Sequence, residues 1–182
     1  MQKENLYFIA VIPPGDICRE IEIFKRDFAE RFAAKEALKN VAHITLKAPF
    51  KLPVEQHGRL AEWFNNLSIE EVPFGLRLKD FDCFIDNLVI FIKPEPNILL
   101  TTLQKSIIRQ FVPAFPNIRV SRLELKFHPH ITVAYRDLTA GQFADAWSEY
   151  RNKKYAASFM VNEFYLLQHD TKRWNIIHTH KI

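Results

Sequence analysis

Cysteine is scarce in this chain, and its scarcity excludes two classes of protein. Cys18 and Cys83 are the two cysteines among 182 residues. Two thiols are too few for the disulfide framework of a small secreted domain, and too few for a cysteine-rich metal site. Because disulfides are rare in reducing compartments, we expect a cytoplasmic protein that keeps both thiols reduced.

Glycine and long apolar runs are also in short supply. The chain has four glycines, so it contains little flexible linker, and 16 phenylalanines indicate an aromatic core. No apolar run approaches the ~20 residues that a helix needs to span a bilayer. The run at 6–12 stops at two prolines and has neither the basic lead nor the cleavage site of a signal peptide. We therefore expect no membrane association.

The excess of positive charge is small. Twenty-five lysines and arginines against 21 acidic residues give a formal net charge of +4. This charge suits a ligand that carries phosphate, but it is too weak to indicate broad binding of nucleic acid. The length fits a single domain over residues 1–182, with two lobes that share a core and no obligate protein partner.

Hydrophobic periodicity predicts four helices. Residues 16–32 carry the clearest stripe, with apolar side chains at spacings of three or four and Asp16 as the expected N-cap. Helices are also predicted at 54–67 and 98–112. A capping box at Thr139 predicts a short fourth helix.

Alternating and β-branched runs predict the strands between these helices. A change of parity within 73–85 indicates a bulge near Lys79 and Asp80. Segment 115–127 is expected to be a strand or a loop with strand character, and the last two runs are expected to form a terminal hairpin. The predicted strands lie at residues 6–12, 41–50, 73–85, 88–92, 129–136, 158–170 and 173–180.

The order of the predicted elements repeats. Each half of the chain contains a helix, a strand, a second helix and then a hairpin. Helices combined with antiparallel connections argue for an α+β fold of two similar lobes. We expect the lobes to be related by a pseudo-two-fold duplication, each an antiparallel sheet with helices outside, with a central cleft between them.

One tetrapeptide pattern occurs at matching places in the two halves. The first half contains HITL at residues 43–46, and the second half contains HITV at residues 130–133. Alternate residues of a strand share a face. Each histidine therefore shares a face with its threonine, while the aliphatic residues anchor the strand in its lobe. If the two polar faces oppose each other, they form a cleft with two imidazoles and two hydroxyls.

That set of groups suits displacement at phosphorus. The ordinary histidine pKa of about 6.5 allows one imidazole to be neutral and the other protonated near neutral pH. The neutral ring can take a proton from the attacking oxygen, and the protonated ring can give one to the leaving oxygen on the opposite side of the phosphorus. The threonines can donate hydrogen bonds to the non-bridging oxygens. This chemistry requires no metal and no cofactor.

The paired His-x-Thr-hydrophobic motifs resemble the signature of the 2H phosphoesterase superfamily. Within it, they are most similar to the 2′-5′ RNA ligase-like, or LigT-like, cyclic phosphodiesterases. Phe50 after the first motif and FHPHITVAYR around the second also look typical of that family. The resemblance covers nearly the whole chain through the order of its elements.

The resemblance implies a bilobal fold and a specific chemistry. It implies His43, Thr45, His130 and Thr132 as the functional residues, with no departure from the family pattern at these four positions. The expected substrate is a nucleotide or RNA end bearing a 2′,3′-cyclic phosphate or a 2′-5′ linkage. The expected reaction is its hydrolysis, or ligation in the reverse direction. The motif does not tell which histidine is the base.

Three residues near the motifs are candidates for substrate binding. Lys47 and Arg136 would attract a phosphate if they rim the cleft. Tyr135 could stack on a base. Ordinary solvated charge, or packing in the core, is the alternative for each.

Two other functions compete with the phosphoesterase. One is a non-catalytic RNA- or nucleotide-binding module of the same fold. The other is a metalloprotein that uses the pairs His128/His130 and His178/His180, although Pro129 interrupts the first pair. For the motif residues themselves, the alternative is two histidines and two threonines that simply favour strands.

Overall fold

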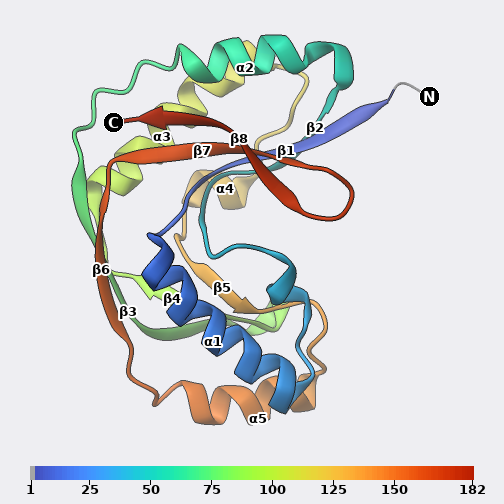
Figure 1. The fold of residues 1–182 in the computed structure, drawn as a ribbon, viewed down its shortest axis with the longest axis vertical. Helices are drawn as coiled ribbons and strands as arrows, with labels where there is room; N and C mark the ends of the chain where they lie inside the picture. The colour runs from blue at the N-terminus through green and yellow to red at the C-terminus, as the bar shows by residue number, and fades with distance from the viewer. Residues whose placement is uncertain (1–2) are drawn as a thin grey trace.

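Two antiparallel sheets form the framework of the computed structural model, which describes residues 3–182. In that part of the chain, strands in the order β2-β1-β7-β8 make a first sheet, and strands in the order β5-β4-β3-β6 make a second (Figure 1). Helices cover one face of each sheet. The predicted α+β class and the two predicted lobes are therefore confirmed.

The bounds of the elements follow the order of the chain. The strands are β1 (Glu4–Val11), β2 (Ile44–Pro53), β3 (Phe74–Phe84), β4 (Val89–Pro94), β5 (Ile131–Ala134), β6 (Ala156–Val161), β7 (Glu163–His169) and β8 (Trp174–Lys181). The α-helices are α1 (Gly15–Phe32), α2 (His57–Asn65), α3 (Ile98–Ala114), α4 (Arg122–Lys126) and α5 (Ala140–Tyr150). Single 3₁₀ turns are η1 (Glu36–Lys39), η2 (Val54–Gln56) and η3 (Ile85–Asn87).

Strands occupy corresponding places in the two sheets. β2 and β5 are edge strands, and β1 and β4 are their inner neighbours. The chain passes from β1 to β2 through α1 and η1, and from β4 to β5 through α3 and α4. The two halves interleave because β7 and β8 return from the second half to complete the first sheet. The correspondence places one copy of the tetrapeptide at the edge strand of each sheet.

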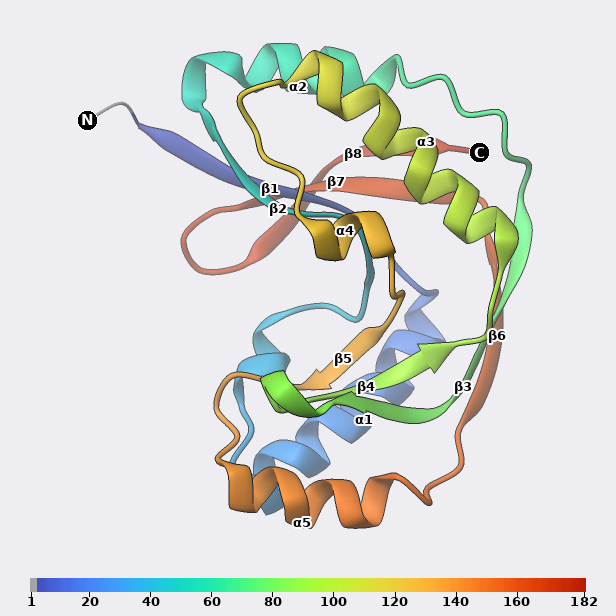
Figure 2. The same ribbon diagram turned by 180° about the vertical axis from the view of Figure 1, so that it is seen from behind.

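Two of the helices, α1 and α3, cross from the sheet they leave to the other sheet. α1 leaves the first sheet and packs against β5 of the second sheet and against α5, while α2 contacts β8 and α3 contacts β2. α1 crosses over because its stripe of Ile17, Ile21, Phe28 and Phe32 needs an apolar surface to cover it. Figure 2 shows α2 and α3 beyond the first sheet and α1 and α5 beyond the second. The other faces of the sheets therefore point toward each other.

Several local predictions are confirmed. The bulge within β3 appears as a register shift between Leu78 and Phe81, and Asp80 takes a left-handed backbone with φ 58°. The capping box at Thr139 starts α5. β7 and β8 form the terminal hairpin. None of the helices formed by residues 3–182 has the length and apolar character needed to cross a membrane.

Three local predictions are wrong. Segment 115–127 contains no strand in the structure, because a capping box between Ser121 and Glu124 starts the short helix α4 instead. The run at 158–170 is not one strand but two, since β6 pairs with β3 and β7 pairs with β1. Alternating apolar and polar residues indicate a strand, but they do not indicate which strand it pairs with. Asp16 lies in the first turn of α1 and does not cap it, because Pro14 occupies the N-cap position.

Candidate active site

The two motif histidines are held by the same hydrogen bond. His43 Nδ1 lies 2.7 Å from the carbonyl oxygen of Val41, and His130 Nδ1 lies 2.7 Å from the carbonyl oxygen of His128. A carbonyl oxygen only accepts, so each Nδ1 must carry the hydrogen. We therefore assign to both neutral rings the tautomer whose Nε2 is free to take a proton.

This hydrogen bond depends on where the strands begin. The sequence suggested that each histidine lies within a strand, but β2 begins at Ile44 and β5 begins at Ile131, one residue later. The carbonyl two residues before each histidine therefore belongs to a connecting segment. There it accepts from the imidazole and not from a neighbouring strand.

Aromatic rings fix the orientation of both imidazoles. The His43 ring lies 4.9 Å from the ring of Phe8, which in turn packs edge-on against Trp174. The His130 ring lies 5.1 Å from Phe84 and 5.3 Å from Phe91. Phe8 belongs to β1 and Phe91 belongs to β4, which are corresponding strands, so the duplication extends to the support of each histidine.

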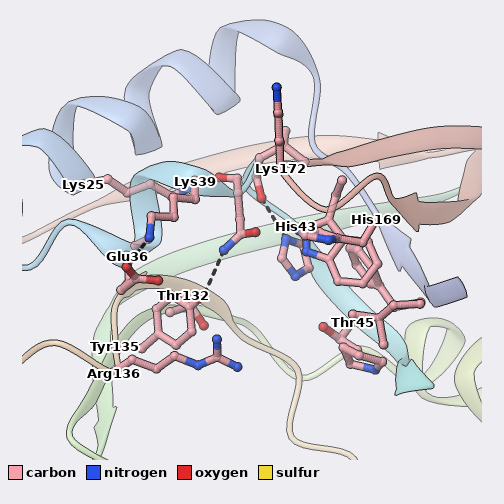
Figure 3. A pocket seen from close by; sticks show the side chains of 17 residues that line it. Lys25, Glu36, Lys39, His43, Thr45, Thr132, Tyr135, Arg136, His169 and Lys172 are labelled. Atoms are coloured by element: carbon pink, nitrogen blue, oxygen red, sulfur yellow. Dashed lines mark hydrogen bonds and ion pairs between the residues drawn. The ribbon is translucent and has the colours of Figure 1, made fainter. Parts of the chain in front are cut away.

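A groove of about 400 Å³ brings most of the predicted site residues together. His43 and Thr45 line it from the first lobe, and Thr132, Tyr135 and Arg136 line it from the second (Figure 3). His130 is not part of this lining. It precedes Thr132 by two residues, and its charge lies close enough to His43 to lower the pKa of that ring.

Burial lowers the pKa of both histidines. Desolvation is the main cause at His43 and brings its pKa to about 4, although the hydrogen bond to Val41 opposes it. The positive charges of Lys25 and His130 lower it further. Desolvation also lowers the pKa of His130, while the bond to the His128 carbonyl again opposes the shift. A bound phosphate would favour the protonated rings and counteract these shifts.

The sequence interpretation missed Lys25, whose side chain lines the groove at 2% exposure. Its ammonium group donates a 2.6 Å hydrogen bond to the carbonyl oxygen of Asn40, and burial lowers its pKa. A lysine in an amphipathic helix is expected on its polar face. The position of Lys25 four residues after Ile21 and three before Phe28, within the apolar stripe, is the signal that could have revealed it.

Lys47 lies in a different environment from the one expected of a substrate-binding residue. Its side chain is 1% exposed and forms a 2.8 Å ion pair with Glu124 Oε1, which also accepts from the backbone N–H of Ala48. The other oxygen of Glu124 accepts from the N–H of Ser121. Burial raises the pKa of Glu124, but these donors outweigh it and leave the pKa below its usual range.

The Lys47–Glu124 ion pair links the motif segments of the two lobes. Lys47 follows Thr45 by two residues in β2, and Glu124 lies in α4, shortly before His130. The pair therefore attaches the segment that leads into His130 to the strand that carries Thr45. Lys47 supports the site from inside the protein and does not line the groove.

A second set of hydrogen bonds joins the same two lobes. Asp137, which follows β5, accepts hydrogen bonds of 2.6 and 2.9 Å from the backbone N–H groups of Lys35 and Glu36. The side-chain amide of Asn40 donates a 2.8 Å hydrogen bond to the hydroxyl of Tyr135. The segment before His43 is thus attached to the segment after Thr132.

The two remaining predicted residues lie at the rim. Tyr135 presents its ring to the groove while its hydroxyl accepts from Asn40. Arg136 is exposed, has a left-handed φ of 68°, and its guanidinium lies 5.1 Å from the centre of the Tyr135 ring. Both residues can therefore contact a ligand, with Arg136 free to reach a phosphate.

The histidine pairs do not form a metal-ligand cluster in the structure. Across residues 3–182, no three side chains of histidine, cysteine, aspartate or glutamate lie close enough to hold one ion. His180 contacts the carbonyl oxygen of Leu67 through Nε2 and the carbonyl oxygen of Lys181 through Nδ1.

Comparison with known proteins places this arrangement in a family. The model of the 2′-5′ RNA ligase superfamily matches residues 13–173. A candidate phosphoesterase of Geobacillus kaustophilus is 29% identical over 175 residues, which cover 95% of this chain and 94% of that protein. A second candidate phosphoesterase, from Bacillus cytotoxicus, is 30% identical over 139 residues, covering 75% of this chain and 76% of that protein.

Solved structures show the same fold. Escherichia coli LigT superposes with a TM-score of 0.66 at 19% identity, covering 99% of each chain. A protein of Thermus thermophilus superposes with a TM-score of 0.54 at 17% identity, covering 97% of each chain. The similarity in fold therefore extends over almost the whole chain.

The Lys47–Glu124 ion pair generates a stability prediction. Lys47→Met leaves the Glu124 carboxylate buried without its cation, and Glu124→Gln leaves the ammonium without its anion. We expect each change to lower the free energy of unfolding by about 3–5 kcal/mol, measured by urea denaturation. The double variant should lose less than the sum of the two single changes, because it leaves no unpaired charge.

Lys51→Met is the matched control for this measurement. Lys51 lies in the same strand but is exposed, and its ammonium group is 3.9 Å from Glu4. We expect this change to alter stability by no more than about 0.5 kcal/mol. If Lys47→Met lowers the free energy of unfolding no more than Lys51→Met does, the Lys47–Glu124 ion pair does not constrain the structure.

Proposed function

The chain belongs to the 2′-5′ RNA ligase superfamily, and on that premise we propose that it is a phosphoesterase whose two motif histidines act as general base and general acid. The proposed substrates are a 2′,3′-cyclic phosphate or a 2′-5′ phosphodiester of a nucleotide or RNA end. Hydrolysis is the proposed direction, with ligation as its reverse. The mechanism needs no metal ion.

The matched hydrogen bonds of the two imidazoles carry this proposal. Both Nδ1 atoms are occupied by a backbone carbonyl, so the only free nitrogen on His43 and on His130 is Nε2. A free Nε2 on each ring supplies the single proton acceptor and the single proton donor that in-line displacement requires. Strand propensity alone does not explain why two segments far apart in the sequence orient their histidines identically.

The two imidazole rings account for both proton transfers of the proposed reaction. One neutral imidazole takes a proton from water through Nε2 while the water oxygen forms a bond to phosphorus. The bond from phosphorus to the ribose oxygen breaks on the opposite side, and that oxygen takes the Nε2 proton of the other, protonated imidazole. Thr45 and Thr132 donate hydrogen bonds to the non-bridging oxygens, where negative charge accumulates.

The surroundings of the rings support an assignment of roles in hydrolysis. His43 has the more strongly lowered pKa and lies near the buried cation Lys25, so it is the ring that stays neutral and serves as base. His130 then serves as the acid. In ligation the roles exchange, because the same transition state is crossed in reverse.

The groove suits a nucleotide. Its lining combines the aromatic rings of Tyr135 and Trp174 with the cations Lys25 and Arg136, which match a base and a phosphate. LigT of Escherichia coli has been crystallised with 3′-AMP, with NADP+ and with ATP. These complexes support a nucleotide as the ligand class for this chain.

The histidine assignment generates a direct test. We expect His43→Ala and His130→Ala each to lower kcat for a 2′,3′-cyclic nucleotide by at least about 100-fold, because each removes one proton transfer. His178→Ala, whose ring lies outside the groove, should retain activity within about twofold. Activity should also persist in excess chelator.

The outcomes distinguish the competing functions. A motif variant that is folded and fully active would remove that histidine from the mechanism. Nucleotide binding without turnover, across cyclic phosphates and 2′-5′ dinucleotides, would favour a binding module of the same fold instead.

The lowered pKa values generate a prediction about pH. Because the pKa of each histidine lies below the ordinary 6.5 in the empty site, the general acid loses its proton at lower pH than usual. We expect kcat/KM to be highest below pH 6.5 and to fall as pH rises. The profile of kcat should lie at higher pH, since the bound phosphate raises both pKa values. An optimum of kcat/KM above pH 8 would contradict this account.

A further inference from the structure

A second groove, of about 780 Å³, adjoins the segment that leads into His130. Its walls come from β3 and β4, from the start of α3 and from the segment 127–129 that leads into His130. Two of its rings, Phe84 and Phe91, are the rings that contact the His130 imidazole. His130 therefore stands beside this groove, whereas His43 lines the first one.

The lining of the second groove offers flat apolar surfaces and little free polarity. Phe84 and Phe91 lie with their ring centres 4.5 Å apart. Asn97 is engaged by the protein, since its oxygen caps α3 and its amide donates one hydrogen bond to the carbonyl of Gly75. Asp82 and Lys93 pair with each other at 3.5 Å. Ile98 is 76% exposed at the mouth of the groove.

Backbone strain keeps one further ring at this groove. Phe127 follows α4 and has a φ of 27°, a conformation that residues other than glycine rarely adopt. Such strain costs free energy and persists only where the surrounding structure imposes it. Here it brings the Phe127 side chain into the lining beside His128 and Pro129.

The geometry of displacement gives this groove a role. The attacking and leaving oxygens lie on opposite sides of the phosphorus. The substituent on the oxygen that His130 protonates therefore lies on the His130 side of the phosphorus, where Phe84 contacts the imidazole. In a 2′,3′-cyclic mononucleotide one ribose carries both the leaving oxygen and an equatorial oxygen, so its single base can occupy only one of the two grooves. In a dinucleotide the leaving oxygen carries a second nucleoside.

We infer that the second groove binds the base of a leaving nucleoside, so that the preferred substrate has a nucleoside on each side of the phosphorus, as in a 2′-5′-linked dinucleotide. This inference rests on the proposed function. A planar base matches the flat rings of Phe84 and Phe127, and stacking on such rings requires no hydrogen-bond readout. The groove therefore selects for a second base without selecting strongly which one.

The test compares two substrates and two kinds of variant. Phe127→Ala removes a stacking surface, Phe127→Tyr restores it, and Ile98→Ala trims a part of the lining that is 76% exposed. Ile23→Ala, at an exposed site on α1 outside the groove, is the control. The readouts are kcat/KM for 2′-5′-linked ApA and for 2′,3′-cyclic AMP.

The expected pattern is selective. Phe127→Ala should lower kcat/KM for the dinucleotide by about tenfold and change that for cyclic AMP by less than about twofold. Phe127→Tyr should keep wild-type preference, and Ile98→Ala should show a smaller loss confined to the dinucleotide. Equal losses on both substrates with both truncations, or no loss on the dinucleotide, would overturn the inference. So would a change of molar mass in Phe127→Ala, which would mark the groove as a contact between copies of the chain.

Binding measurements distinguish a failure of this inference from a failure of the proposed function. In the His43→Ala background, which does not consume substrate, calorimetry with 2′-5′-linked ApA and with 2′-AMP reports occupancy alone. If wild-type protein turns over neither substrate but Phe127→Ala still weakens the dinucleotide selectively, the groove assignment holds and the catalytic assignment fails. If turnover is normal but the dinucleotide binds no differently in Phe127→Ala, the reverse is true.

Discussion

The buried ion pair between Lys47 and Glu124 is the constraint on which the candidate site depends. One histidine and one threonine belong to each lobe, so the distance between the two imidazoles is set by how the lobes are held together and not by either motif. A charge pair in the interior stabilises one geometry only when its remaining hydrogen-bonding groups are satisfied. Glu124 meets that condition, since both of its oxygens also accept from backbone N–H groups. Asp137 performs the equivalent task for the segment ahead of His43.

The duplication extends from the motifs into the interactions that support them. α1 and α3 occupy corresponding places, and each contributes one buried polar side chain to the short helical segment ahead of a motif. Lys25 donates to the carbonyl of Asn40, and Gln104 donates to the carbonyl of Glu124. Downstream, the same carbonyl-to-Nδ1 bond orients each imidazole. The two copies differ in charge, because a cation stands near His43 and a neutral amide occupies the equivalent position. We propose that this difference lets one ring act as base and the other as acid.

Much of this arrangement could be predicted from the sequence because it depends on local patterns. The apolar stripe at 16–32, the bulge in β3 and the two His-x-Thr motifs are all encoded over a few residues. The rest depends on which surfaces meet. A lysine is expected to be solvated whether or not another lobe covers it, so the sequence does not reveal that Lys25 and Lys47 are buried. The alternating run at 158–170 could not reveal that its two parts join different sheets. Phe84 and Phe127 belong to no sequence motif, and the role proposed for them follows only from their position near His130.

The central claim is that His43 and His130 act on opposite sides of one phosphorus atom. A crystal structure with a vanadate adduct of a nucleoside, which mimics the five-coordinate transition state, tests it most directly. The account predicts that Nε2 of His43 and Nε2 of His130 each contact one apical oxygen, with the hydroxyls of Thr45 and Thr132 on the equatorial ones. An adduct that touches only one of the two imidazoles, or that binds through Nδ1, would contradict it.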